Sequence, residues 1–305
     1  MKSNFDFLQP YWPVLANFGS LAEQYCYTDA NSSIMKVGMI GETIVNLIYL
    51  EDKISYPYDN SANTRIDKLQ TEDYITNDLA DILHALRKAR NKAVHQNYSS
   101  VDTAKALLQM AYSLCEWFME TYGDYSYQHK DFVMPLPSSA SVPPADKTAE
   151  EKKENELIKE AENEAEQKEK TDPKERKKNA KRAAGNRVKT EAETRYMIDE
   201  QLRKVGWEAD TPVLRYSKGT RPEKGRNLAI AEWPTDSDDG GKGFADYALF
   251  IGLKMVATVE AKASHKDIPS VLDVQCRDYS SHIRQEDASY VISNWGAYQV
   301  PFTFS

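Results

Sequence analysis

The chain has 305 residues, of which 41% are hydrophobic and 28% are charged, and its formal net charge is −8. This length suggests about two domains. The acidic balance excludes a uniformly basic nucleic-acid-binding protein but leaves room for a local basic patch.

The cysteine content and the hydropathy indicate in which cellular compartment the protein is expected. The three cysteines, Cys26, Cys115 and Cys276, are far apart and form no C-x-x-C pair. This spacing argues against a zinc site or a disulfide framework and fits a reducing, cytoplasmic setting. No sequence segment approaches about 18 consecutive apolar residues, so we expect neither export nor a membrane span.

Residues 1–135 carry helical periodicity. Apolar residues recur at spacings of three and four in ETIVNLIYL, DLADILHALRKARNKAVH and AKALLQMAYSLCEWFMETY. This pattern predicts an all-helical bundle of about five helices. The segment holds 11 basic and 17 acidic residues, which disfavours a duplex-binding surface.

Residues 136–190 predict a charged linker. PLPSSASVPPAD is rich in turn formers. In EEKKENELIKEAENEAEQKEK, Leu157 and Ile158 are almost the only large apolar residues, so we expect this stretch to bury no face. KERKKNAKRAAGNRVK has eight basic residues against one acid. We interpret it as a solvated connector, with an arm that contacts phosphates as the alternative.

Residues 191–305 predict an α/β domain. TEAETRYMIDEQLRKVGW and SVLDVQCRDYSSHIRQ have helical patterns. Between and after them lie the strand-like runs PVLRY, LAIAEWP, ADYALFI, MVATVEAKA and SYVISNW. A strand-rich centre flanked by helices is typical of this class.

The hairpin ADYALFIGLKMVATVEAKA, residues 245–263, carries three charged residues at its open end: Asp246, Glu260 and Lys262. Residues two apart in a strand share a face. The acidic side should carry Val256, Thr258, Glu260 and Lys262, and the core side Met255, Ala257, Val259 and Ala261. Asp246 faces Glu260 only if the loop after Ile251 has three residues or a bulge shifts the register.

Two carboxylates held side by side repel each other unless a cation lies between them. Mg²⁺ takes one or two carboxylates and fills its shell with water and phosphate oxygens. Lys262 would orient or activate the attacking water, or offset charge that develops on the phosphate. This set suits metal-assisted phosphodiester hydrolysis. The alternative is an edge hairpin with a surface ion pair.

Gln275 and Tyr279 follow at positions i and i+4 of a predicted helix, so they share a face. Together with Asp246, Glu260 and Lys262, they resemble the PD-(D/E)xK nuclease core with its Q-x-x-x-Y extension, an α/β fold with a central mixed sheet. A departure is that Ala245, not proline, precedes the aspartate.

The blocks ETRYMIDEQLRKVGW, AIAEWP, ADYALF…VEAKA, QCRDYS and VPFTFS resemble, in order, the nuclease region of type I restriction enzyme R subunits. The resemblance implies that Asp246 and Glu260 bind metal and that Lys262 is catalytic. It implies that Gln275 and Tyr279 contact DNA or position ligands, and Glu193 is a candidate third acid.

The helical region has its own resemblance. RKARNKAVH, with Arg90 and His95, and the opening FDFLQPYWP resemble the DUF4145-type helical domain at the front of many R subunits. That domain is similar to the HEPN group, whose R-x4-6-H motif cleaves RNA in some members. Positions five apart in a straight helix lie about 140° apart. The two residues therefore share a site only if the helix ends or bends between them, or across a dimer. The alternative is that Arg90 pairs with a nearby acid.

These resemblances imply a cytoplasmic, Mg²⁺-dependent DNA endonuclease module of a type I restriction system. Its partners would be double-stranded DNA and the methylase and specificity subunits, with no membrane. No phosphate-binding G-x-x-x-x-G-K-[ST] motif occurs, so ATP would act only through a motor domain that we expect beyond this chain. The chain alone is expected to be inactive or non-specific. The alternatives are an HEPN-like, metal-independent ribonuclease and a non-catalytic assembly module.

Overall fold

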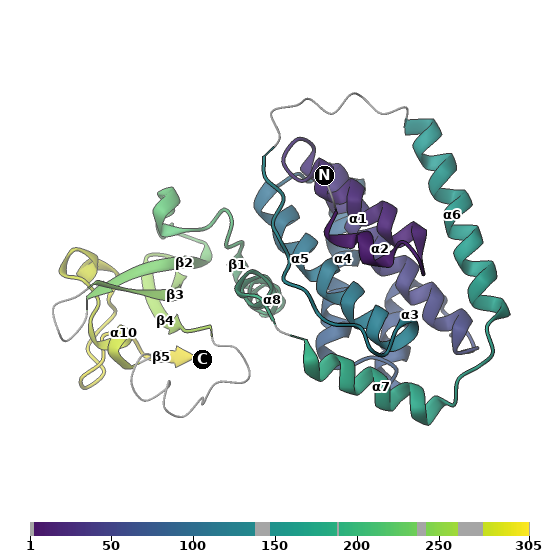
Figure 1. Ribbon diagram of the computed structural model, residues 1–305. Coiled ribbons are helices and arrows are strands. Elements are labelled where there is room, and N and C mark those ends of the chain that lie inside the picture. Colours follow the sequence, from purple (N-terminus) through teal and green to yellow (C-terminus); the bar gives the residue numbers. More distant parts are fainter. Residues whose placement is uncertain (1–2, 138–146, 188, 237–241, 262–276, 305) are drawn as a thin grey trace. The chain divides into compact units, whose positions relative to one another are not determined.

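The computed structural model divides into two compact units, Met1–Val188 and Lys189–Ser305, which we call the helical unit and the sheet unit (Figure 1). The residues that it describes are 3–137, 147–187, 189–236, 242–261 and 277–304.

The first part of the helical unit is the predicted bundle. After the 3-10 helix η1 (Asn4–Leu8) come α1 (Pro13–Tyr25), α2 (Ala30–Glu51), α3 (Ala62–Thr71), α4 (Asn77–Gln96) and α5 (Val101–Phe118), followed by the π-helical turn η2 (Met119–Gly123). Helix α2 is central, because it packs against α1, α4 and α5. By length and hydropathy α2 alone among the described helices would pass for a membrane span, but 72% of its most apolar window is buried within the protein, as in a core helix.

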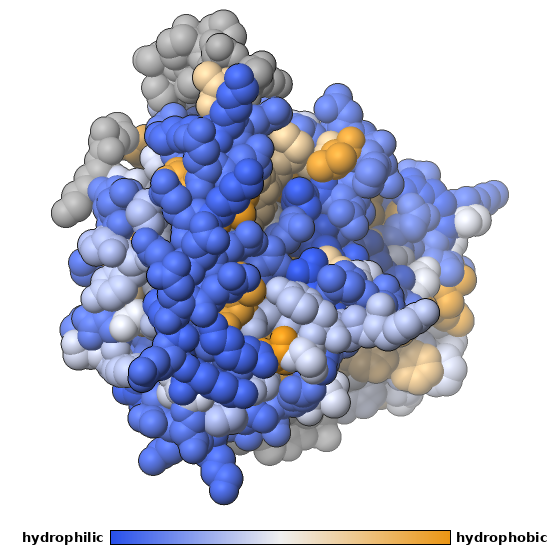
Figure 2. All heavy atoms as spheres, turned by 90° about the vertical axis from the view of Figure 1, so that its right-hand side faces the viewer, coloured by the Kyte–Doolittle hydropathy of each residue, from blue (hydrophilic) through white to orange (hydrophobic). Residues whose placement is uncertain are grey.

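The predicted linker differs from its expectation, because most of it belongs to the helical unit. Residues 147–187 form α6 (Lys147–Gln167) and α7 (Pro173–Asn186), and both helices contact the bundle. Their buried residues are small or charged: Glu154, Ala161, Ala165, Arg176, Ala180 and Ala183. The expectation that this stretch buries no face was wrong, since alanines allow close approach and ion pairs supply the remaining contacts. Figure 2 shows the face that carries α6 as largely hydrophilic.

Helix α6 is held by ion pairs to residues far away in the sequence. The Lys36 ammonium is buried and contacts the carboxylates of Glu154 and Glu150, the latter at 2.7 Å. The Lys168 ammonium lies 2.6 Å from the buried Glu51 carboxylate. Lys168, the residue after α6, therefore ties the end of this helix to the bundle.

Helix α7 is anchored by the buried Arg176. Its Nε donates to Asp52 Oδ1 at 3.1 Å and its Nη1 donates to the Thr121 carbonyl at 2.6 Å. The guanidinium carbon also lies 4.0 Å from the centre of the Tyr122 ring. Nearby, the Trp117 indole donates to the Ala180 carbonyl at 3.1 Å.

The segment after η2 is tied back to α5 by a histidine that should make stability depend on pH. The His129 imidazole lies 2.9 Å from Glu120 and 3.3 Å from Glu116, both buried. Burial alone would lower the pKa of His129, but its hydrogen bonds and charge contacts with these acids outweigh burial and raise the pKa above 6.5. The stabilisation is thus fully present below about pH 6.5 and is lost as pH rises through the raised folded-state pKa.

We therefore expect the free energy of unfolding to fall as pH rises above neutrality, with part of that fall absent in His129→Gln. Urea unfolding at a series of pH values measures it. His95→Gln, at an exposed position, is the matched control and should keep the wild-type dependence. An unchanged slope in His129→Gln would contradict the assignment.

The sheet unit is built on the predicted mixed sheet. Helix α8 (Glu191–Lys204) precedes five strands that lie in sequence order: β1 (Glu208–Ala209), β2 (Asn227–Asp236), β3 (Lys242–Ile251), β4 (Lys254–Val259) and β5 (Phe302–Phe304). The two outer pairs are parallel and the two inner pairs are antiparallel. Short helical turns, η3 (Tyr216–Lys218), α10 (Arg277–Ser281) and η5 (Gln285–Tyr290), complete the described part.

Two predicted strands are not strands. PVLRY leads into η3, and only Arg215 bridges to β2. SYVISNW begins in η5, where Tyr290 packs its ring against Trp233 and Phe250. Tertiary packing overrides strand propensity here, and residues 302–304 take the sheet edge beside β4 instead.

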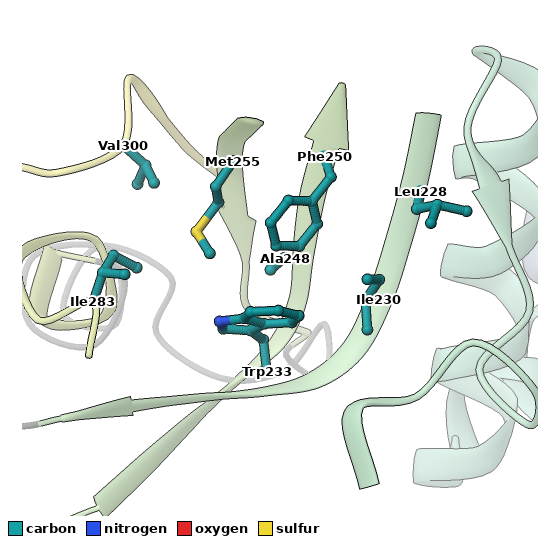
Figure 3. Packing of buried hydrophobic residues seen from close by; sticks show 8 residues of the cluster. All are labelled: Leu228, Ile230, Trp233, Ala248, Phe250, Met255, Ile283 and Val300. Carbon is teal, nitrogen blue, oxygen red and sulfur yellow. The ribbon is translucent and has the colours of Figure 1, made fainter. Parts of the chain in front are cut away.

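Both faces of the sheet are buried. Trp233 lies at the centre of one face among Ile230, Ala248, Phe250 and Met255 (Figure 3). The opposite face consists of Ala229, Ala231, Tyr247, Leu249 and Ala257, and residues of α8 pack on it. The prediction that only one face of the hairpin belongs to the core was therefore too simple, because both faces are buried.

The hairpin between β3 and β4 has a two-residue loop and a bulge. Ile251 pairs with Lys254 across Gly252 and Leu253, and Gly252 adopts φ 58°, which favours glycine. The register then shifts, because Phe250 pairs with Met255 but Leu249 pairs with Ala257. The bulge thereby moves Met255 to the face opposite Ala257, so the prediction that these residues share a face was wrong.

Candidate functional site

The bulge brings the hairpin acids together. After it, Tyr247 pairs with Val259. The next pair in this antiparallel register is Asp246 with Glu260, and the backbone N–H of Ala261 donates to Asp246 Oδ2 at 2.7 Å. Glu260 is buried, at 6% exposure. The bulge is one of the two arrangements that the sequence analysis required for Asp246 to face Glu260.

An arginine that the sequence analysis did not single out holds the other oxygen of Asp246. Arg195 of α8 donates from Nη2 to Asp246 Oδ1 at 3.1 Å, and its side chain is 16% exposed. The Asp246 carboxylate is thus fixed from two sides, by a guanidinium and by a backbone N–H. Glu193 lies two positions before Arg195 in the first turn of α8.

Glu232 of β2 was also missed. The register on both sides of it, Ala231 with Tyr247 and Trp233 with Ala245, places it beside Asp246. Glu232 Oε1 lies 3.6 Å from Arg195 Nη1 and 3.3 Å from Arg215 Nη1. A charged residue inside the apolar run AIAEWP was the signal that could have found it.

The backbone at Glu232 is unusual, with φ 52° in a non-glycine residue. Such conformations cost free energy and gather at functional sites. One visible consequence is that Ile230 and Trp233, three positions apart, share a face of the sheet. The kink therefore seats Trp233 in the core while Glu232 stays with the two arginines.

Charge balance in this cluster favours the ionised arginine. Burial alone would lower the pKa of Arg195, but the charges of Asp246, Glu191 and Glu232 outweigh burial and raise it. Arg195 therefore remains a permanent cation beside the acids, and it offsets part of their mutual repulsion.

A buried hydrogen-bond network positions α8 over the strand that carries Asp246. Thr211 donates its N–H to one oxygen of Asp199 at 2.7 Å and its hydroxyl to the other at 2.9 Å. The Tyr247 hydroxyl lies 2.7 Å from Thr211 Oγ1 and donates to the Arg195 carbonyl at 3.1 Å. This network connects α8 and β3 with Thr211, two residues after β1, so it fixes the position of the Arg195 backbone.

The other predicted site residues are only partly described. Glu193 is buried in the first turn of α8, at 2% exposure. Tyr279 lies in α10, and its ring is close to Gly243 of β3. Lys262 and Gln275 lie outside the described residues.

Arg90 and His95 are not brought together within the chain. Helix α4 runs without interruption from Asn77 to Gln96, so the two side chains leave it in different directions. Arg90 Nη1 pairs with Glu42 Oε2 at 2.6 Å, and His95 is exposed. The helix neither ends nor bends between them, and the ion-pair alternative for Arg90 is the observed one.

Comparison with known proteins covers both units. Residues 208–305 match the second domain of the type I restriction enzyme EcoKI endonuclease subunit, and residues 20–167 match the domain of unknown function DUF4145. The EcoKI endonuclease subunit of Escherichia coli (strain K12) is 30% identical over 90% of this chain. The chain is a distant homologue of this subunit. No solved structure matches.

The matches cover only part of the related subunit, and one of them extends into the predicted linker. The chain spans 28% of the length of the EcoKI subunit. The DUF4145 match continues to Gln167, the last residue of α6. The first half of the predicted linker is thus part of the matched domain, in agreement with its packing on the bundle.

The described side chains can supply about two ligands to a divalent ion, so water would complete most of its coordination shell. Among the described residues, no three His, Cys, Asp or Glu side chains are grouped closely enough to hold a metal ion. Asp246 and Glu260 offer two carboxylates, which is the usual protein share of a Mg²⁺ shell that water and phosphate oxygens complete. These two residues would hold the ion, and the donor chemistry fits Mg²⁺ over a soft metal.

Proposed function

We propose that this chain is the DNA-cleaving part of a type I restriction system and that its sheet unit hydrolyses phosphodiester bonds of double-stranded DNA with Mg²⁺. The supporting observation is the β3–β4 register, which ends with Tyr247 opposite Val259 and, continued by one residue, would set Asp246 opposite Glu260, in a unit that matches a domain of a restriction endonuclease subunit. The methylase and specificity subunits of such a system are the proposed partners, and the cytoplasm is the proposed compartment.

The residues divide the work as follows. Asp246 and Glu260 bind the ion. Bound Mg²⁺ supplies Lewis-acid polarisation of the scissile phosphate. Arg195 and the Ala261 N–H hold the Asp246 carboxylate in one orientation, so little conformational freedom is lost when the ion binds. Arg195 is therefore a positioning residue.

The remaining roles follow the family motif. Lys262 orients or activates the attacking water, and Gln275 and Tyr279 contact the DNA or position its phosphate. Glu193 is the proposed third acid. Arg215, next to Glu232 and about one-third exposed, is suited to a phosphate oxygen of the DNA backbone.

Metal binding tests the proposal on the chain itself. Titration with Mn²⁺, a probe for the Mg²⁺ site, should show one site by isothermal calorimetry. Glu260→Gln should weaken it by about tenfold or more, because one of two protein ligands loses its charge. Glu223→Gln is the control, since Glu223 is an exposed acid of the same unit that pairs with Arg226. Equal Mn²⁺ affinity in the wild type and in Asp246→Asn/Glu260→Gln would refute the site.

A further inference from the structure

A cavity of about 270 Å³ lies wholly inside the helical unit, between α2, α3 and α4. It is separate from the acids of the sheet unit, because every lining residue belongs to these three helices or to the start of α3. One part of its lining, called the wall below, is charged, and another part, called the floor, is apolar. Each part limits the chemistry of a ligand.

The wall is rich in arginine. Arg65 from α3 and Arg87 and Arg90 from α4 line the cavity, and Glu42 is the acid among the lining residues. Three guanidinium groups and one carboxylate leave a net charge of +2. Arg90 and Glu42 form an ion pair at the exposed rim, with side chains 36% and 42% exposed.

Arg65 and Arg87 have neutral partners instead. Arg65 donates to the Asn46 side-chain oxygen, and Arg87 Nη2 donates to Asn63 Oδ1 at 2.9 Å. Guanidinium groups bind phosphate and carboxylate oxygens through charge-assisted hydrogen bonds, so three of them on one cavity favour an anionic ligand.

The start of α3 adds further donors. Ser61, Ala62 and Asn63 line the cavity, and Ser61 is the N-cap of the ten-residue α3. The first backbone N–H groups of a helix have no acceptor within it, and this end carries the positive pole of the helix dipole. At this end Asp59 already accepts from Ser61 and Thr64, so only the remaining first-turn N–H groups are available to an anion, the charge that the arginines also favour.

The floor is apolar. Val45, Ile66 and Leu83 line it. Helices α2 and α4 approach closely here, because Gly38 has no side chain. A Cβ at this position would lie only 2.5 Å from the Cβ of Arg90. A bare inorganic ion would leave this surface without contacts, whereas a ring or an alkyl body would cover it.

We propose that this cavity binds a small phosphate monoester with an apolar or aromatic body, the size of a mononucleotide. A phosphate monoester carries a charge of about −1.5 to −2 at neutral pH, which matches the charge of the wall. A single carboxylate would neutralise only half of it. The volume is at the lower end of ligand pockets, about 300 Å³ and above, so larger cofactors do not fit.

Calorimetric titration of the whole chain tests the proposal with three probes: adenosine 5′-monophosphate, inorganic phosphate and adenosine. We expect the monophosphate to bind most tightly, because it alone engages both the wall and the floor. Arg87→Gln should weaken its binding about tenfold or more, since a charge-assisted contact is lost. The matched control is Lys152→Gln on α6, which removes one exposed cation outside the cavity.

Glu42→Gln separates binding from folding, because it predicts a gain. Removal of the rim carboxylate raises the wall charge to +3, so binding of the monophosphate should tighten severalfold, which a damaged protein would not show. No binding of any phosphate probe at millimolar concentration overturns the proposal, as does an affinity that neither Arg87→Gln nor Glu42→Gln changes. Mn²⁺ binding by the sheet unit is independent of all these outcomes.

Discussion

Asp246→Asn is expected to lower DNA cleavage by about a thousandfold or more while ATP hydrolysis by an assembled type I restriction complex containing this chain is retained. A bound divalent ion contributes several kcal/mol to stabilisation of the transition state, and about 1.4 kcal/mol corresponds to a tenfold change in rate. The asparagine keeps the size of the side chain and can still accept from the Ala261 N–H, but it lacks the charge that binds the ion. Plasmid cleavage at saturating Mg²⁺ gives the rate.

Two controls make the cleavage result specific. Glu223→Gln removes an exposed acid of the same unit and should cleave at the wild-type rate. Arg195→Gln removes the cation that holds Asp246 and should lower the rate less than Asp246→Asn does, because the carboxylates remain. Wild-type cleavage by Asp246→Asn would mean that these carboxylates do not perform the reaction.

Arg176→Met is expected to destabilise the helical unit by about 3–5 kcal/mol, because it leaves a buried acid without its partner. Asp52 is 1% exposed and Glu51 is 2% exposed, and Arg176 contacts both. Methionine fills most of the arginine volume, so the change isolates the charge. Hydrogen exchange of α7 and urea unfolding measure the effect.

Lys178→Met is the matched control, since Lys178 lies on the exposed side of the same helix. It should change the free energy of unfolding by less than about 0.5 kcal/mol, as is usual for surface substitutions. Faster exchange confined to α7 and the adjoining η2 in Arg176→Met would show that this ion pair is what holds the helix. Equal effects of the two substitutions would show that α7 is held by its alanine contacts instead.

The candidate site was predictable from the sequence as far as strand alternation reaches. The spacing of Asp246 and Glu260 on a hairpin limited the geometry to a loop of three residues or a bulge, and the bulge at Val256 is the form that occurs. Alternation could not select between them, because both place the acids opposite each other. The bulge also decided which face Met255 occupies, and the sequence pattern predicted that face wrongly.

The partners of these acids depend on elements far apart in the chain. Arg195 is 51 residues from Asp246, and Arg215 comes from the loop before β2. The local sequence ETRYMI does not predict that Arg195 contacts Asp246 of the hairpin. The positive φ at Glu232 is equally unpredictable from the local pattern, because glutamate rarely adopts this conformation.

Apolar periodicity and strand alternation act over a few residues, so the helical bundle and the mixed-sheet unit were predictable from the sequence alone. That α6 and α7 belong to the bundle became visible only in the folded chain. Their stability rests on Lys36 with Glu154 and on Arg176 with Asp52, pairs separated by 118 and 124 residues. The sequence does not show which charged residues stay in water and which become buried beside an opposite charge, and only the buried pairs hold the helices in place.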